Sequence, residues 1–377
     1  MASKWVEKAL GEVIELKRGF DLPQRQRQSG QVPIVSSSGI IGHHSEAKVK
    51  GPGVVTGRYG TLGEVFYIAE DFWPLNTALY VEDFKGNDPR FVSYFLRTIN
   101  FLAYSDKAAV PGVNRNHLHT AKVLWPSDVN EQRTIAHILA TLDNKIEVNR
   151  HINETLEEIA RAIFTPWFGN TDPVRTIVSN LIVEEALEIG DGYRAKNDEL
   201  GSEGLPFIRA GNLKNGFDTS NADRLKPESV VLALNKISRV GDVAFTSKGT
   251  IGRFARVGET TERFVYSPQI CYWRSLDYHR IHPAVLYCWM QSDDFKNQVL
   301  AVAGQTDMAP YVSLKDQKRM SIPVFDDSQY EIGERITPLL ARQSLNDAES
   351  RTLSVLRDSL LPKLISGELL VPVGAAQ

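Results

Sequence analysis

The sequence lacks the short motifs that mark most catalytic and nucleotide-binding sites. Its 377 residues contain no Walker A motif, no G-x-G-x-x-G at a helix start, no G-x-S-x-G and no H-E-x-x-H. The tetrapeptide of amino-methyltransferases, Asn or Asp followed by two prolines and an aromatic residue, is absent as well. We therefore expect a protein that is not an enzyme, with no catalytic residues, no metal site and no cofactor of its own.

Cysteine is scarce, and long apolar runs are missing. Cys271 and Cys288 cannot form a zinc cluster alone, and their apolar neighbours favour buried, unreactive thiols. No run of 18 apolar residues could span a membrane, and the N-terminal residues contain no apolar stretch of signal-peptide type. We expect a cytoplasmic protein with reduced thiols.

An excess of positive charge is also missing. The chain has 43 Lys and Arg against 46 Asp and Glu, so its formal net charge is −3. A protein that simply coats nucleic acid is far more basic, and charge alone therefore does not indicate DNA as a partner. The hydrophobic share of 42% is ordinary for a globular protein, and the length suggests two or three domains.

What the sequence does contain is an internal repeat. Residues Ile14–Phe20 resemble Leu187–Tyr193, which lie 173 positions later. Gly60–Gly63 resemble Gly249–Gly252 at an offset of 189, and the offset reaches 197 towards the end of each half. Because the order is kept while the offset only grows, we predict two homologous halves with insertions in the second.

Each half is predicted to hold a globule followed by a long helix. The globules, residues 1–126 and 174–323, mix short β-rich runs with turns and a few helical segments. The helical regions are residues 127–173 and 324–377. The expected fold class is α+β, with two repeated α/β globules separated by two long helices.

The first helix is predicted over residues 131–165, which contain neither glycine nor proline, and the second over about 329–365. Pro166 and Gly169 should close the first helix, and Pro338 should kink or interrupt the second. Apolar and amide residues recur at the alternating spacing of a coiled-coil seam. A helix of ~35 residues, roughly 50 Å long, cannot bury such a stripe against a small globule, so we expect the two helices to pair.

An approximate two-fold axis between the halves would make this coiled coil antiparallel and pseudo-symmetric. Asn149 and Asn346, which are 197 positions apart, then meet near the centre of the seam, with Asn153 and Gln343 close by. A buried polar pair fixes the register of a coiled coil, since a slip would place amides against leucines. The residues predicted to pair the helices are Ile135, Leu139, Leu142, Ile146, Asn149, Leu156, Ile163, Ile336, Leu339, Asn346, Leu353 and Leu360, and Leu340 and Leu356 are expected to widen the second apolar face.

The strongest binding signals are the two glycine loops, because Arg58 stands beside the first and Lys248 beside the second. Small residues let the backbone approach a phosphate, and a cation neutralises it; the plainer alternative is a tight turn with a solvated cation. Arginine can also bond guanine, and asparagine adenine, in a bidentate manner. The residues predicted to contact DNA are Arg25, Arg27, Ser37, His43, Arg58, Tyr59, Thr61, Asn76, Asn114, Arg115, Arg194, Lys196, Arg209, Asn212, Lys248, Thr250 and Gln269.

The adjacent histidines, His43 and His44, are a weaker signal. In a strand their side chains would face opposite sides, so they could not share a metal ion. We expect both to be turn or surface residues, with a nucleic-acid contact as the alternative.

The start of the first helix resembles a known family. Trp125-Pro126, Glu131-Gln132, Ile135, Leu139 and Leu142-Asp143 are similar to the opening of the conserved-region helix in type I restriction–modification specificity subunits. The two glycine loops and the ending Leu360–Gly367 are similar to that family too, and the resemblance covers essentially the whole chain. The second helix departs from the pattern, because Gln329-Tyr330-Glu331-Ile332 stands where the Glu-Gln pair is expected.

The resemblance implies a non-catalytic DNA-recognition subunit. The two globules would be target-recognition domains, each reading one half of a bipartite target in double-stranded DNA. The paired helices would set the distance between the half-sites and dock two methyltransferase subunits and the restriction subunits of a phage-defence complex. S-adenosylmethionine, ATP and Mg would then belong to those partners rather than to this chain.

Three other interpretations remain open. The same architecture could serve another restriction class, which co-purified subunits would distinguish. The globules could bind proteins instead of DNA, and a lack of retention on duplex DNA would favour such a scaffold. The chain could also be an enzyme with an unrecognised site, which methyl transfer or cleavage by the pure chain would support.

Overall fold

A computed structural model describes residues 5–105, 112–170, 174–214, 216–303, 311–324 and 327–371. The chain divides into two units: unit 1 contains Met1–Ile146 and Arg351–Gln377, and unit 2 contains Glu147–Ser350. Each unit holds one globule together with one end of each long helix. No helix of the described residues is long and apolar enough to cross a membrane.

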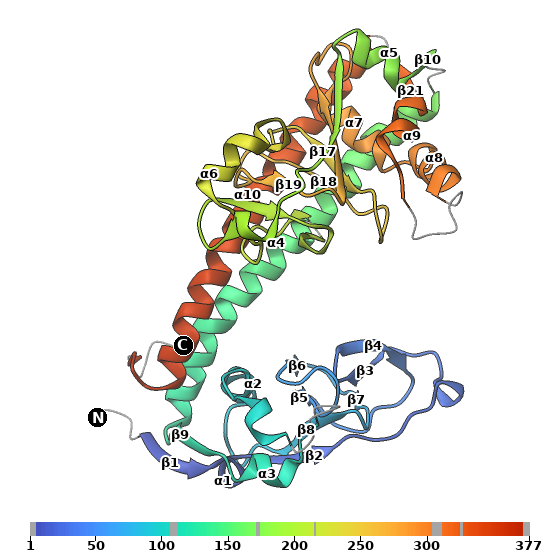
Figure 1. Cartoon of the computed structure of the whole chain (residues 1–377). Helices are drawn as coiled ribbons and strands as arrows, with labels where there is room; N and C mark the ends of the chain where they lie inside the picture. The colour runs from blue at the N-terminus through green and yellow to red at the C-terminus, as the bar shows by residue number, and fades with distance from the viewer. Residues whose placement is uncertain are drawn as a thin grey trace. The chain divides into compact units, whose positions relative to one another are not determined.

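The globule of unit 1 is built on two small sheets (Figure 1). The larger sheet is antiparallel, and its strand order is β2-β8-β5-β6. The smaller sheet has the order β4-β3-β7, with β3 and β7 parallel. The strands and helices of this globule are β1 (Trp5–Ala9), α1 (Leu10–Val13), β2 (Glu15–Arg18), η1 (Gln24–Gln26), β3 (Val32–Ser36), β4 (Gly39–His44), β5 (Gly53–Gly57), β6 (Val65–Ile68), β7 (Trp73–Pro74), β8 (Ala78–Asp83), α2 (Pro89–Arg97), η2 (Phe101–Tyr104), α3 (Arg115–His119) and β9 (Lys122–Pro126).

The globule of unit 2 repeats this topology. Its main sheet has the order β11-β20-β17-β18, and its second sheet again contains one parallel pair, β13 with β19. The elements are β10 (Val174–Ile177), α5 (Val178–Val183), β11 (Leu187–Asp191), η3 (Asn197–Glu199), β12 (Leu200–Gly201), β13 (Leu205–Ile208), η4 (Ala210–Asn212), β14 (Leu213–Lys214), β15 (Gly216–Phe217), β16 (Arg224–Leu225), α6 (Pro227–Val230), η5 (Val231–Lys236), β17 (Val243–Thr246), β18 (Phe254–Arg256), β19 (Val265–Tyr266), β20 (Ile270–Ser275), α7 (Pro283–Met290), α8 (Asp293–Ala303), α9 (Leu314–Arg319) and β21 (Ser321–Val324).

The repeated strand order confirms the α+β fold with two homologous globules. The rise of the sequence offset from 173 to 189 is explained by insertions between β13 and β17, where unit 2 has η4, β14, β15, β16, α6 and η5, and the further rise to 197 comes after the second glycine loop. Each globule also opens and closes on a two-stranded antiparallel ribbon, β1 with β9 and β10 with β21. The duplication is therefore visible in the connectivity of the backbone as well as in the sequence.

Aromatic side chains fill the cores beneath these sheets. In unit 1 the buried ring of Trp125 packs edge-on against Phe91 and Phe95, with ring centroids 5.3 and 4.7 Å apart. In unit 2, Trp273 packs edge-on against Phe295 at 5.6 Å. Cys271 is buried as expected, whereas Cys288 is only partly buried. Burial raises the pKa of the Cys271 thiol and raises that of Cys288 to about 12.

The two long helices are α4 (Val129–Asn170) and α10 (Ser328–Ile365). The prediction that Pro166 closes the first helix is wrong, since Pro166 lies inside α4. The second helix runs through Pro338, so of the two predicted effects, a kink or an interruption, the interruption does not occur. A proline removes one backbone hydrogen bond, and tertiary packing can offset that loss. In α4 the rings of Phe164 and Phe168 stack at 5.2 Å on either side of Pro166, and Ile336 and Leu340 are buried on either side of Pro338.

The helices pair in an antiparallel manner, as predicted. In unit 2 the Asn149 side chain donates to the backbone oxygen of Asn346 at 3.4 Å, and Gln343 donates to the backbone oxygen of Asn153 at 2.8 Å. Residue numbers on α10 therefore decrease as those on α4 increase, which means that the two helices run in opposite directions. The predicted closeness of Asn149 and Asn346, with Asn153 and Gln343 beside them, is confirmed.

The amide cluster at this point is larger than the sequence indicates. Asn149 and Asn346 are fully buried, and the Asn149 amide also donates to Glu349 at 2.8 Å and to Ser350 at 3.2 Å. The Asn346 amide donates to the side-chain oxygen of Asn153 at 2.8 Å. In a poorly solvated seam, such a connected network specifies one register because a shift would leave its members unsatisfied.

The remaining predicted pairing residues divide between the cores of the units. Ile135 and Leu139 are fully buried in the core of unit 1, and Leu360 packs against that core. Ile336 lies in the core of unit 2, and Ile163 and Leu339 pack against it. The other members of the set are partly buried: Leu142, Ile146, Leu156 and Leu353. Leu356 is 44% exposed, so the expectation that it widens the apolar face is wrong.

Asn346→Ala should lower the free energy of unfolding by about 1–3 kcal/mol, because Asn153 loses the donor of a part-buried hydrogen bond. Chemical denaturation of the full chain measures this change. Leu345→Ala is the matched control, since Leu345 adjoins the cluster on the same helix but is 53% exposed. Equal effects of the two substitutions would show that the amide network is not a stabilising feature.

Candidate nucleic-acid interface

The two glycine loops are the turns of equivalent β-hairpins. The first connects β5 to β6 and the second connects β17 to β18. Gly60 and Gly63 have φ angles of +79° and +87°, and Gly249 and Gly252 have +80° and +91°. Residues with a side chain rarely adopt these left-handed conformations, so both loops require glycine at both positions.

The cations beside these two loops, Arg58 and Lys248, are not at equivalent positions of the repeat. The backbone oxygen of Arg58 accepts from the amide of Val113 at 3.0 Å, whereas in the second half Ser247 accepts from Val312 at 2.9 Å. Arg58 therefore corresponds to Ser247. Lys248 occupies the place of Tyr59, because it forms the equivalent β-bridge.

Four cations of unit 1 gather around one open pocket beside the first glycine loop, which we call the basic pocket. It is lined by Lys17, Arg18, Arg58, Tyr59, Leu79, Gly112, Val113, Asn114 and Arg115. Four of its predicted DNA contacts, Arg58, Tyr59, Asn114 and Arg115, are thus brought together. Lys17 and Arg18 were missed, although they end strand β2 directly before a glycine that belongs to the repeated segment.

Local contacts hold the basic pocket in shape. The Arg58 guanidinium lies over the Tyr59 ring, 4.6 Å from its centroid. A side chain at Gly112 would meet that ring at 2.4 Å, so only glycine fits there. The Asn114 side chain accepts from the amide of Asn116 at 3.0 Å and so caps α3, the helix that carries Arg115.

The other predicted contacts of unit 1 are spread over its surface. Arg25 and His43 are exposed, Ser37 lies in the turn between β3 and β4, and Thr61 is exposed in the first glycine loop. The side chain of Arg27 donates to the backbone oxygen of Leu22 at 3.5 Å, and that of Asn76 donates to Asp21.

The expectation for His44 is wrong. It is buried at the end of β4, where its ring meets the edge of Trp73 and its Nδ1 accepts from the amide of Gln28 at 3.0 Å. His43 points to the opposite face of the strand and is exposed. The two rings therefore face opposite sides of the strand, as predicted, but the His44 ring is buried in the globule.

In unit 2, three predicted residues meet at η4. The Asn212 side chain accepts from the amide of Arg209 at 3.0 Å, and the Gln269 side chain accepts from the amide of Ala210 at 3.3 Å. Arg209 is held by an ion pair with Asp223. The exposed residues Arg194, Lys196, Lys248 and Thr250 complete the predicted set in this unit.

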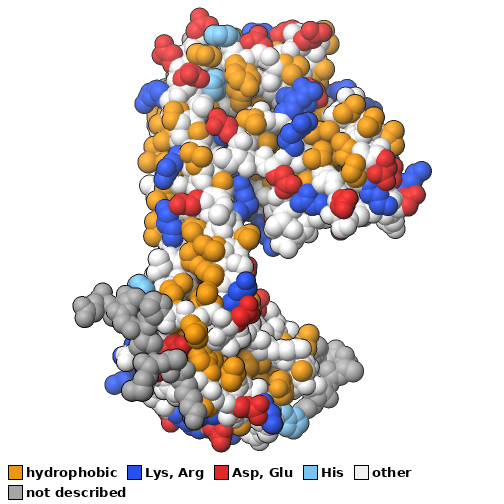
Figure 2. Space-filling model, turned by 90° about the vertical axis from the view of Figure 1, so that its left-hand side faces the viewer, with side chains coloured by type: hydrophobic (Ala, Val, Ile, Leu, Met, Phe, Trp, Pro, Cys, Tyr) orange, Lys and Arg blue, Asp and Glu red, His pale blue; other side chains and the backbone are white. Residues whose placement is uncertain are grey.

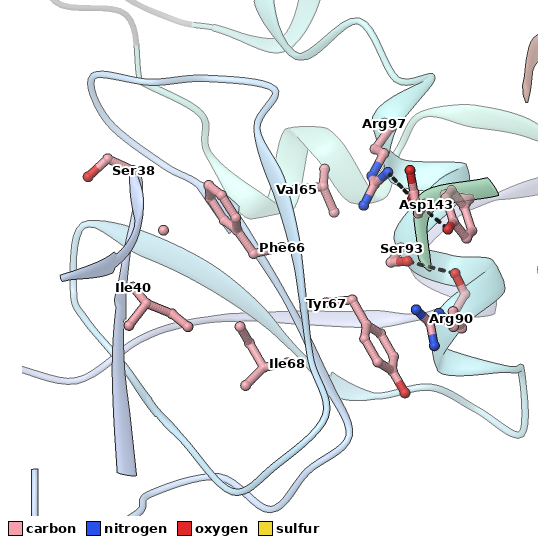
Figure 3. Close-up of a pocket in the computed structure, with 12 residues that line it drawn as sticks. Ser38, Ile40, Val65, Phe66, Tyr67, Ile68, Arg90, Ser93, Arg97 and Asp143 are labelled. Atoms are coloured by element: carbon pink, nitrogen blue, oxygen red, sulfur yellow. Dashed lines mark hydrogen bonds and ion pairs between the residues drawn. The ribbon is translucent and has the colours of Figure 1, made fainter. Parts of the chain in front are cut away.

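A second pocket of unit 1 also contains arginines, but these are engaged (Figure 3). Arg97 lies 3.3 Å from Asp143, and Arg90 donates to Asn144 at 3.2 Å. Asp143 also accepts from Tyr94 at 2.7 Å. Burial alone would raise the pKa of Asp143, but the hydrogen bonds from Arg357 and Tyr94 outweigh burial and lower it.

Two buried glutamines connect the helices to the globules, and sequence reasoning missed their role. Gln132, at the start of α4, accepts from the amide of Asp88 at 2.9 Å, and Asp88 is the N-cap of α2. Gln329, 197 positions later, accepts from the amide of His282 at 3.1 Å, and His282 is the N-cap of α7. The second helix therefore keeps the glutamine of the Glu-Gln pair at the equivalent position.

On the face drawn in Figure 2, Lys and Arg side chains alternate with Asp and Glu, and no large field of one sign appears. This mixture agrees with the net charge of −3.

Comparison with known proteins gives a consistent result. Residues 2–158 match the family described as "Type I restriction modification DNA specificity domain". The chain is 25% identical over 304 residues to the MjaIX type I restriction enzyme specificity subunit of Methanocaldococcus jannaschii, covering 74% of this chain and 69% of that one. It is 24% identical over 389 residues to S.MpnORF638P of Mycoplasma pneumoniae, which is named as a type I specificity subunit, with 96% of each chain covered.

Residues 2–158 thus carry the DNA specificity domain of type I restriction–modification systems, and the chain as a whole is similar to type I specificity subunits. The fold agrees, since the crystal structure of the type I system S subunit from M. genitalium superimposes with a TM-score of 0.63 at 18% identity, covering 96% of both chains. The predicted family is thus confirmed. As a specificity subunit, the chain is a non-catalytic component of its system.

Asp143→Asn should lower the free energy of unfolding by about 1.5–3 kcal/mol, because charge-assisted bonds from Arg97 and Arg357 are lost. The folded-state pKa of Asp143 is lowered, so its contribution should be present above the ordinary pKa near 4 and lost as the pH falls further. Denaturation at pH 7 and pH 3 measures both effects.

The Asn variant should therefore differ less from the wild type at pH 3 than at pH 7. Glu7→Gln is the control, since Glu7 forms an exposed ion pair with Lys122 and its replacement should leave stability unchanged. A constant difference between wild type and Asp143→Asn at both pH values would contradict the electrostatic explanation.

Proposed function

We propose that this chain binds a bipartite target in double-stranded DNA and docks the methyltransferase and restriction subunits of a type I complex. The observation that carries the proposal is the duplication. Two globules of the same strand order, each with its own glycine loop, occur in one chain of the specificity family. Two equivalent binding modules in one chain suit a target made of two separated half-sites.

In this proposal, residues 1–126 and 174–323 are target-recognition domains, and residues 127–173 and 324–377 are conserved helical regions. Each target-recognition domain reads one half-site through its loops. The amide cluster around Asn149 and Asn346 fixes the register of the helices, and a slip by one turn would move them by about 5.4 Å, or roughly one and a half base pairs of DNA. The helices thus serve as a spacer of defined length.

Catalysis belongs to the partners in this proposal. Methyl transfer with S-adenosylmethionine, and restriction with ATP and Mg, would take place in the methyltransferase and restriction subunits. The groups of at least three His, Cys, Asp or Glu that could hold a metal ion are absent from the described residues of this chain. Its own contribution is binding and positioning.

Replacing residues 1–126 with the corresponding domain of another specificity subunit should change only one half of the methylated sequence. The reason is that each globule carries a complete set of the repeated elements. Methylation-sensitive sequencing of DNA modified by the assembled methyltransferase reads the outcome. If the swap altered both halves of the sequence, the domains would not read DNA independently, and the proposal would fail.

Lys248→Ala should weaken binding to duplex DNA about two- to threefold, irrespective of base sequence, and should lower the slope of log K against log salt by about one unit. Lys248 is exposed beside the second glycine loop, where a phosphate could approach it. Lys122→Ala, which removes another exposed cation, should leave both values unchanged. If Lys248→Ala bound like the wild type, the second loop would be a turn only.

A further inference from the structure

The basic pocket stands out because three of its four cations have no carboxylate partner among the described residues. Lys17 forms an ion pair with Glu82 at 2.5 Å. Within the described part of the chain, Arg18, Arg58 and Arg115 have no carboxylate partner, and none of the residues that line the pocket is acidic. Many other arginines do have carboxylate partners: Arg97, Arg150, Arg161, Arg175, Arg209, Arg224, Arg274, Arg280 and Arg357.

Two of the cations, Lys17 and Arg115, are close enough to repel each other. Hydrogen bonding to Glu82 raises the pKa of Lys17, and Arg115 opposes that rise. Arg115 also reaches the backbone oxygen of Leu16 at 3.5 Å, so it lies beside the strand that carries Lys17 and Arg18. Unpaired like charges held together destabilise a fold, and an anion bound among them removes that cost.

Among the described residues of the second half, none of the positions equivalent to these four cations is basic. The register of the main sheets places Gly190 and Asp191 where unit 1 has Lys17 and Arg18. The hairpin and the following helix place Ser247 and Leu314 where unit 1 has Arg58 and Arg115. Asp191 is moreover paired with Lys236 at 3.2 Å. The four cations of unit 1 are thus replaced by neutral residues and one carboxylate.

We propose that the basic pocket binds a single phosphate group of the DNA backbone, and that the two half-sites are therefore held unequally. This inference rests on the proposed function. It adds which residues bind the DNA backbone, and that the two half-sites are bound in different ways. Guanidinium groups bind phosphate through several charge-assisted hydrogen bonds, and three of them around one pocket suit one tetrahedral anion. The first half-site is then anchored by a multidentate contact, and the second by separate single cations such as Lys248.

The test measures duplex DNA binding by the full chain over a range of salt concentrations. The variants are Arg58→Gln, Arg115→Gln and the double variant, with Lys122→Gln as the control on an exposed cation of the same unit. Each single variant should bind about tenfold more weakly, and Lys248→Gln should lose no more than about threefold. The salt slope should fall by about one unit in either single variant and by no more than that in the double variant, because one phosphate is lost.

A second arm uses inorganic phosphate without DNA. Phosphate should raise the melting temperature of the wild-type chain and not that of the double variant, and the melting temperatures in phosphate-free buffer should show that all variants are folded. Phosphate stabilisation together with unchanged DNA binding in the variants would mean a site for a free anion, which overturns the assignment to DNA.

Two further outcomes would also overturn the inference. A slope that falls by two units in the double variant would mean that the arginines contact separate phosphates. Variants that bind DNA and phosphate like the wild type would mean that the pocket takes no anion. If the wild-type chain and its methyltransferase assembly failed to bind duplex DNA at all, the proposed function itself would fail, which is a distinguishable result.

Discussion

Each globule is closed by a two-stranded antiparallel ribbon at the start of a long helix, and the other features depend on these two ribbons. Trp5 pairs with Pro126 in the first ribbon, and Val174 pairs with Val324 in the second. The chain therefore enters and leaves each globule at the same place. Within the first turn of the helix that follows, a buried glutamine bonds the N-cap of a globule helix and ties the two together. This attachment fixes where the sheets of each globule, with their loops and the basic pocket, lie relative to the start of the helix that follows.

Much of this arrangement was predictable because it repeats. The offset between Gly60 and Gly249 and its growth along the chain predicted two matching glycine loops and insertions in the second half. The spacing of apolar and amide residues predicted the long helices, and the meeting of Asn149 with Asn346 followed from their offset alone. Periodicity and duplication constrain the placement of the backbone strongly, because an element predicted in one half is also expected at the equivalent position of the other half.

The predictions failed where tertiary contacts decide the outcome. Pro166 and Pro338 do not end their helices, because packing of the neighbouring side chains compensates for the lost hydrogen bond. The candidate site was found only in part, since Arg58 and Arg115 were selected from loops while Lys17 and Arg18 come from a strand. A pocket assembled from segments about 40 and 60 residues apart leaves no local pattern in a sequence.

The contacts of the amide cluster have a further consequence for symmetry. Asn149 donates to Ser350, and Asn346 donates to Asn153. Asn346 lies 197 positions after Asn149, and Ser350 lies 197 positions after Asn153, so the two hydrogen bonds join equivalent positions of the repeat. An interface in which both partners use the same positions to contact each other is isologous, and it is found between the subunits of a two-fold homodimer. Here one polypeptide supplies both sides. The copies have since diverged, because the asparagine on one side of this contact is matched by a serine on the other. A single chain can therefore keep the geometry of a homodimer interface while its two halves change sequence separately.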